Sequence, residues 1–139
     1  MSTVSKTIDE AQVAVVGAGP AGSTAARILA AAGLEILILE KDIPPRPKTC
    51  GGGVLPRALD LLPPGLEKVV ERQCLEVDFN LHDSSGLVFS HAAARSKPLI
   101  TMVRRDIFDA WLLDEALKHG ARLRAGSIVE EVVESRDGD

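Results

Sequence analysis

Residues 17–22, which read GAGPAG, constrain the fold of this chain more than any other stretch. The apolar run before them, residues 11–17, has the β-branched cluster of a strand buried on both faces. The alanine-rich residues 21–33 end on a glycine and predict a helix. LEILILE at residues 34–40 predicts a second buried strand. This order predicts an α/β fold that begins with a Rossmann-like βαβ unit, parallel in its strands and right-handed in its crossover.

The glycine turn has the spacing of the dinucleotide fingerprint GxGxxG, and it lies between the predicted strand and helix as that fingerprint requires. Gly17 would make the tight turn, Gly19 would let a pyrophosphate approach the backbone, and Gly22 would let helix and strand pack closely. The helix start, with Pro20 and Ala21, offers backbone N–H groups and a positive dipole end to phosphates. The sequence therefore predicts a dinucleotide site.

Glu40 closes the second predicted strand, where a dinucleotide-binding unit carries an acidic residue. Its carboxylate can accept hydrogen bonds from both ribose hydroxyls of an adenosine, and its charge repels a 2′-phosphate. Lys41 beside it is assigned to the same cofactor site. The alternative is a glycine turn in an unrelated α/β protein, which the flanking strand and helix disfavour.

After Glu40 the chain leaves the α/β pattern. Residues 42–56 form an irregular connection rich in proline and glycine, and short helices are predicted at 57–62 and 64–72.

A period of two begins at Leu75 and predicts an antiparallel insert. Apolar residues alternate with polar ones through residue 81, residues 83–86 turn the chain, residues 87–91 return, and residues 99–103 are a third strand. We expect one face of this insert to be buried. Flavin enzymes use such an insert to split the nucleotide domain, so the topology favours FAD over NAD.

The last third of the chain returns to a helix and a strand. Residues 105–120 predict an amphipathic helix that ends at Gly120, with an inward face of Phe108, Trp111, Leu112, Leu113 and Ala116. Residues 127–135 predict a strand, and residues 136–139 a hairpin turn. Because the chain stops where a returning strand is expected, we expect it to be the N-terminal portion of a longer protein.

Composition and charge exclude several classes of function. The net charge is −4 and no basic block is present, so nucleic-acid binding is not expected. Cys50 and Cys74 form no CxxC pair and lie near no spaced histidines, which argues against a metal site or a disulfide framework. The polar N-terminus lacks the apolar core of a signal peptide, and glycine, proline and charge interrupt residues 11–39. We expect a cytoplasmic protein and leave peripheral contact with a membrane open.

Three segments carry a resemblance to a known family. They are VAVVGAGPAGSTAARILAAAGLEILILEK at residues 13–41, RPKTCGGGVLPRAL at 46–59 and VRRDIFDAWLLDEALKHGA at 103–121. Together they resemble the start of the geranylgeranyl reductase family, within the flavoproteins similar to p-hydroxybenzoate hydroxylase. The CGGG followed by a proline is the discriminating element, because halogenases and aromatic hydroxylases of the group carry other sequences there.

The resemblance implies roles for the CGGG loop. Cys50, Gly51, Gly52 and Gly53 would pass close to the flavin, where side chains would collide with the ring or ribitol. Cys50 would then lie near the reacting edge of the ring and is our candidate catalytic residue. The alternative is that a small, weakly polar residue merely fits the loop.

Two further cofactor contacts are implied by the resemblance. Arg105 matches an arginine that contacts FAD, although it could instead cap its helix or pair with Asp109 one turn on. Val129 would lie on a strand whose backbone reaches the adenine. Arg46, Lys48 and Arg104 are candidates for phosphate contacts, with solvated charges as the alternative.

The expected function is that of an FAD-dependent oxidoreductase that reduces carbon–carbon double bonds of an isoprenoid (geranylgeranyl) group. The resemblance implies a prenyl-lipid substrate and NADPH or a ferredoxin-like donor as reductant. A flavin monooxygenase of the same fold, or a truncated FAD-binding module without activity, remains the alternative. The oligomeric state is left open.

The expected division of the chain has four parts. A flexible N-terminus spans residues 1–10, and the FAD-binding unit with the CGGG loop spans 11–73. Residues 74–103 begin a substrate domain, and residues 104–139 return to the FAD-binding domain.

Overall fold

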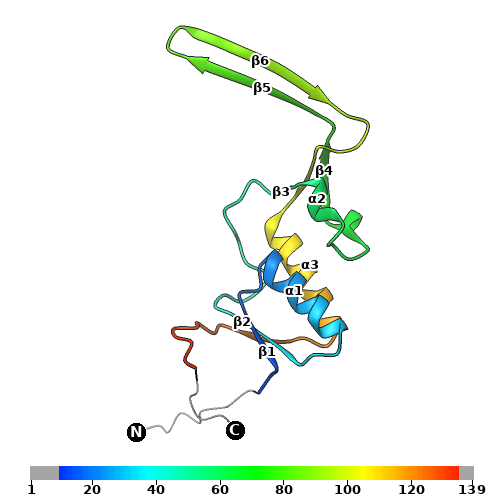
Figure 1. The fold of residues 1–139 in the computed structure, drawn as a ribbon, viewed down its shortest axis with the longest axis vertical. Helices are drawn as coiled ribbons and strands as arrows, with labels where there is room; N and C mark the ends of the chain where they lie inside the picture. Colours follow the sequence, from blue (N-terminus) through cyan, green and yellow to red (C-terminus); the bar gives the residue numbers. More distant parts are fainter. Residues whose placement is uncertain (1–9, 135–139) are drawn as a thin grey trace.

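The computed structural model describes residues 10–134. Two long helices pack together at one end of the molecule beside a parallel sheet, and a hairpin extends away at the other end (Figure 1). The elements in order are β1 Val13–Val16, α1 Pro20–Ala31, β2 Ile36–Glu40, β3 Gly53–Val54, α2 Pro56–Leu59, the 3₁₀ helix η1 Leu66–Lys68, β4 Val70–Cys74, β5 Glu76–Asp83, β6 Gly86–Ala94, β7 Ile100–Val103, α3 Arg105–Lys118 and β8 Arg122–Ala125.

The parallel sheet has the order β1-β2-β8 and confirms the predicted βαβ unit. Strand β2 is buried along most of its length because it has a partner on each side. The expectation that the first strand is buried on both faces is wrong. In β1, Val13 and Val15 pack against the core, whereas Ala14 and Val16 are exposed.

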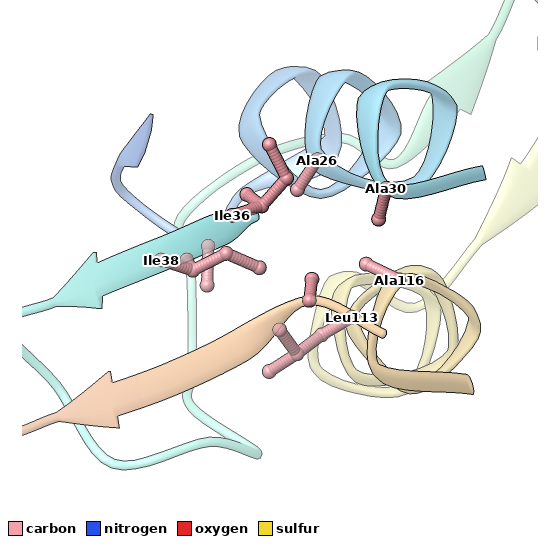
Figure 2. Close-up of a cluster of buried hydrophobic side chains, with 8 residues drawn as sticks. Ala26, Ala30, Ile36, Ile38, Leu113 and Ala116 are labelled. Atoms are coloured by element: carbon pink, nitrogen blue, oxygen red, sulfur yellow. The ribbon is translucent and has the colours of Figure 1, made fainter. Parts of the chain in front are cut away.

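The main core lies where α1 and α3 meet the parallel sheet (Figure 2). Small side chains on α1, Ala26 and Ala30, let the helices approach closely, and Ile36 and Ile38 of β2 fill the space beneath. The amphipathic helix predicted at residues 105–120 is confirmed as α3. Its Trp111 is half-buried and packs on Phe108, with ring centroids 5.8 Å apart.

The third strand of the parallel sheet lies earlier in the chain than the strand predicted at residues 127–135. It is β8, paired with β2 directly after α3, whereas residues 127–134 form no strand. Val132 and Val133 in that segment are 86% and 76% exposed, so their apolar pattern has no partner strand among the described residues. The rest of that prediction, Ser135 and the turn at 136–139, lies outside the described residues, as do residues 1–9.

A second sheet has the order β3-β7-β4 and is antiparallel. Residues 99–103 were expected to be a third strand of the insert, but β7 pairs instead with β3 and β4. The helix expected at 64–72 is also wrong: only η1 is helical, and β4 follows it. Pairing with β7 overrides the weak helical preference there. The helix expected at 57–62 is confirmed as α2, with shifted bounds.

The predicted hairpin is confirmed as β5 and β6, with Phe79 opposite His91 and Leu81 opposite Phe89. These residues share one face, as the period of two requires. The expectation that this face is buried is wrong within residues 10–134, because Phe79, Leu81 and Phe89 are each more than half exposed. Among the described residues, no helix has the length and apolar character needed to cross a bilayer.

Candidate functional site

The glycine turn joins β1 to α1 as predicted. Gly17 has a φ of +95°, and a Cβ on Gly22 would collide with the Gly17 carbonyl oxygen and lie 3.2 Å from Val15 Cγ1. The close packing of helix on strand expected from Gly22 is therefore confirmed. Gly19 is the N-cap of α1 and Pro20 its first residue, with no acidic side chain in the first turn. The positive end of the helix dipole is thus left for an outside anion.

Glu40 lies beside this turn and is only 3% exposed. Its Oε2 accepts a hydrogen bond from the Ala18 amide at 2.7 Å, and its Oε1 accepts one from the Asp42 amide at 3.1 Å. Burial raises the pKa of Glu40, but these amide hydrogen bonds and the charge of Arg46 outweigh it, so the pKa lies below its ordinary value. The carboxylate is therefore ionised and fixed at the turn. Lys41, assigned to the same site, is exposed.

Arg46 is held by three carboxylates. Its Nη2 lies 3.3 Å from Glu40 Oε2, its Nε 3.7 Å from Asp42 Oδ2 and its Nη1 3.6 Å from Asp109 Oδ2. The side chain is 14% exposed, so the alternative of a solvated charge is wrong for this arginine. Nη2 also lies 3.8 Å from where a Cβ on Gly19 would be, and the guanidinium therefore stands over the second glycine of the turn.

Arg105 forms a bidentate ion pair with Asp109, as its spacing of four residues allows. Nε lies 2.7 Å from Oδ1 and Nη2 2.9 Å from Oδ2. These hydrogen bonds raise the pKa of Arg105 above its ordinary value, and a hydrogen bond to the Cys50 thiol raises it as well. The pairing alternative is confirmed, while the N-cap of α3 is Arg104 rather than Arg105.

Cys50 is exposed at the front of the glycine loop, and Cys50 and Cys74 are both free thiols. Its Sγ accepts a hydrogen bond from the Gly52 amide at 3.4 Å. This bond has the largest effect on the pKa of Cys50 and lowers it, and a hydrogen bond from Arg105 lowers it as well. The thiol is thus biased towards the thiolate, the more nucleophilic and more strongly hydrogen-bonding form.

Gly52 needs to be glycine for a reason that the sequence did not indicate. It is buried with a φ of +74°, and a Cβ would collide with the carbonyl oxygen of Val103 in β7. The Val103 amide donates to the Gly52 carbonyl at 2.9 Å, so loop and strand are locked together. A Cβ on Gly51, by contrast, would have no atom within 4 Å and would face open space.

Two hollows meet at Cys50 and Arg105. The first, of about 600 Å³, is mostly apolar and is bordered by the start of α1, the glycine loop, α2 and Phe108. The second, of about 470 Å³, is lined by charged residues that include Arg46, Lys48, Arg104, Glu71 and Asp106.

The structure brings most of the predicted site residues together. The first hollow alone is bordered by six of them: Pro20, Ala21, Cys50, Gly52, Gly53 and Arg105. Gly51 borders the second hollow. Val129 borders neither and follows β8 in a segment without a strand, so the strand expected at this residue is not found. Sequence reasoning named Asp109 as a partner of Arg105 but missed that it also contacts Arg46. The signal was an acidic residue on the inward face of α3.

These residues fit a dinucleotide. Within 4 Å of a Cβ on Gly19 only Arg46 would lie, and the first turn of α1 carries no acidic residue of its own. Glu40 holds a fixed, ionised carboxylate beside the turn. Backbone amides and an arginine suit a diphosphate, and a carboxylate suits ribose hydroxyls.

Comparison with known proteins agrees with this geometry. A geranylgeranyl diphosphate reductase from Synechocystis is 31% identical over 131 residues, covering 92% of this chain and 31% of the relative. The crystal structure of a geranylgeranyl bacteriochlorophyll reductase-like protein from Thermoplasma acidophilum matches with a TM-score of 0.75 at 27% identity, covering 91% of this chain and 32% of that one. The halogenase PltM in complex with phloroglucinol and FAD matches with a TM-score of 0.72 at 27% identity, covering 94% and 30%.

This chain therefore spans about a third of the length of its relatives. The family described as FAD binding domain matches residues 10–139, nearly the whole chain. Because this match covers well over half of the chain, and the parallel sheet and glycine turn fit it, the chain belongs to the FAD-binding domain family.

Proposed function

We propose that this chain supplies the FAD-binding part of an oxidoreductase that reduces carbon–carbon double bonds in an isoprenoid group. The observation that carries the proposal is the mostly apolar hollow bordered by Cys50, Gly52, Gly53, Arg105 and the start of α1. It places the residues expected at a flavin beside a surface that suits a hydrocarbon chain.

Each part of the chain has a proposed role. Glu40 accepts the ribose hydroxyls, with Lys41 and Val129 towards the adenosine end, and the glycine turn receives the diphosphate. Arg105 and the loop from Cys50 to Gly53 border the flavin. Bound FAD would supply the two electrons of the reduction. The Cys50 thiol, which is exposed and has a lowered pKa, borders the same mostly apolar hollow and could hydrogen-bond there.

The isoprenoid substrate is supported by two relatives whose names refer to geranylgeranyl groups. NADPH or a ferredoxin-like protein is proposed as the electron donor. A prenyl lipid partitions into bilayers, so peripheral contact with a membrane is part of the proposal. We further propose that residues 74–103 contribute to a substrate domain, which the exposed apolar face of β5 and β6 supports.

The test uses the longest natural form of the protein that contains this chain. It is loaded with FAD, reduced anaerobically, and incubated with geranylgeranyl diphosphate, and the product is analysed by mass spectrometry. We expect one dihydrogen to be gained for each double bond reduced. A product of unchanged mass, despite bound and reducible FAD, would contradict isoprenoid reduction.

A flavin monooxygenase is the second candidate, favoured by the likeness to the halogenase PltM. It predicts rapid NAD(P)H-dependent oxygen consumption when an aromatic substrate is added. An FAD-binding module without activity of its own is the third possibility. It predicts that the purified 139-residue chain shows flavin absorbance but no turnover.

A further inference from the structure

We propose that Asp109 is a positioning residue for the dinucleotide: it holds Arg46 and Arg105 as one fixed pair for the diphosphate. This inference rests on the binding of FAD at the glycine turn. It does not depend on which substrate is reduced.

The burial of Asp109 needs an explanation. It is 4% exposed and lies on the inward face of α3, between the buried Phe108 and Leu112. An ionised carboxylate in such a place is costly unless charged partners surround it. An apolar side chain of similar volume would avoid that cost. We therefore infer that the carboxylate serves the two arginines that it contacts.

Both oxygens of Asp109 are engaged by arginines. Oδ1 accepts from Arg105 Nε at 2.7 Å, and Oδ2 accepts from Arg105 Nη2 at 2.9 Å. The same Oδ2 lies 3.6 Å from Arg46 Nη1. One carboxylate thus joins an arginine of its own helix to an arginine of the loop that follows β2, 63 positions earlier in the sequence.

The two arginines lie at different points of the proposed site. The Arg46 guanidinium stands over Gly19, the glycine that would let a pyrophosphate approach. Arg105 borders both hollows and contacts Cys50. Each guanidinium has five N–H donors. Glu40, Asp42 and Asp109 each face one nitrogen of Arg46, and Asp109 accepts from two nitrogens of Arg105, so each guanidinium keeps N–H donors for an anion.

Asp109 also keeps the two cations from repelling one another. Without its charge, Arg46 would depend on Glu40 and Asp42 alone, and the Arg105 side chain would lose its bidentate anchor. Arg105 would then have to be ordered at the moment the diphosphate binds, and Arg46 would be held by two carboxylates rather than three. Ordering these side chains on binding lowers affinity.

The experiment compares Asp109→Asn with Asp114→Asn in the longest natural form of the protein that contains this chain. Asp114 lies on the same helix, is 60% exposed and pairs with Lys118, so its variant is the matched control. Binding of ADP and of adenosine is measured by calorimetry, and folding by circular dichroism. Adenosine tests the ribose contact without the diphosphate.

We expect Asp109→Asn to weaken ADP binding by roughly 10- to 100-fold, the fold-change of losing a charged hydrogen bond. Adenosine binding should stay unchanged, and Asp114→Asn should behave as the wild type. A double-mutant cycle with Arg46→Gln gives a readout that general destabilisation does not produce. Because Asp109 acts through Arg46, the two changes should not be additive. The double variant should lose less binding free energy for ADP than the sum of the losses in the two single variants.

Three results would overturn the inference. They are a folded Asp109→Asn that binds ADP as the wild type does, an equal loss of ADP and adenosine binding, and full additivity in the cycle.

If Asp109→Asn does not fold, Arg46→Lys replaces it, since lysine keeps the charge but not the forked guanidinium that joins Glu40 to Asp109. Unchanged ADP binding by Arg46→Lys would then overturn the inference. A wild type that binds neither ADP nor FAD would overturn the dinucleotide site itself, whereas a wild type that binds ADP but reduces no isoprenoid would leave Asp109 unaffected.

Discussion

The Glu40 carboxylate and the Ala18 amide lie 2.7 Å apart, which ties the end of β2 to the glycine turn that follows β1. The backbone of β2 reaches the same turn, because the Gly17 amide donates to the Leu39 carbonyl at 2.8 Å. One acidic side chain thus supports the turn, and it is the side chain that we propose as the acceptor of the ribose hydroxyls.

Replacing Glu40 with alanine should weaken FAD binding by roughly tenfold or more, because the ribose loses a charged acceptor. The Ala18 amide would also lose its partner. Titration of flavin fluorescence measures the affinity. Glu35→Ala, which removes an exposed acid one residue before the same strand, is the control. Equal FAD affinity in the two variants would count against the ribose assignment.

The pKa of Glu40 predicts how stability depends on pH. Because its folded-state pKa lies below the ordinary value of 4.5, the unfolded chain binds more protons between the two values. Its contribution to the free energy of unfolding is therefore fully present above about 4.5 and is lost as pH falls through the folded-state pKa. Urea unfolding of wild type and Glu40→Gln at neutral pH and at steps through the acid range should show their difference shrinking with acid. A difference that does not change with pH would contradict the shift.

Local patterns predicted the elements of this fold better than their partners. The βαβ unit follows from the apolar runs around residues 17–22, and the hairpin from the period of two after Leu75. A period of two identifies a strand but not the strand beside it. Residues 99–103 were therefore expected to be a third strand of the insert, although β7 lies between β3 and β4.

The site shows the same limit. Gly19 and Glu40 were predicted because the fingerprint specifies them by spacing. The contacts of Arg46 with Glu40 and Asp109 join distant segments, and no spacing rule connects them. Gly52 was assigned to cofactor approach, whereas the structure shows that its own neighbour, Val103, requires the glycine.

Gly51 and Gly52, the first two glycines of the loop, should respond differently to alanine. Gly52→Ala should destabilise the chain by roughly 1–3 kcal/mol through its left-handed backbone. The collision with the Val103 carbonyl adds about 1–3 kcal/mol more. Gly51→Ala has open space around its Cβ and should unfold near the wild-type temperature. Thermal unfolding of both variants checks this, and equal melting temperatures would contradict the role of Val103.

If Gly51→Ala keeps its stability, it becomes the cleaner probe of the cofactor. A loss of FAD affinity in that variant would support close approach of the flavin to the loop. Retention of full affinity would mean that the first of the three consecutive glycines does not serve the cofactor.

Cys50 should react with iodoacetamide at lower pH than an ordinary thiol. Hydrogen bonds from the Gly52 amide and from Arg105 lower its pKa below the ordinary value of 9.0, so the thiolate forms earlier as pH rises. The rate of alkylation, followed by mass spectrometry of the Cys74→Ser variant, should show its midpoint below 9.0. Arg105→Gln should move that midpoint upward, because one of the two hydrogen bonds is lost while the Gly52 bond remains. Lys118→Gln, which changes an exposed cation at the other end of α3, should leave it in place. If Arg105→Gln and Lys118→Gln share the wild-type midpoint, Arg105 does not act on the thiol, and the polarised cysteine would have to be explained by the Gly52 amide alone.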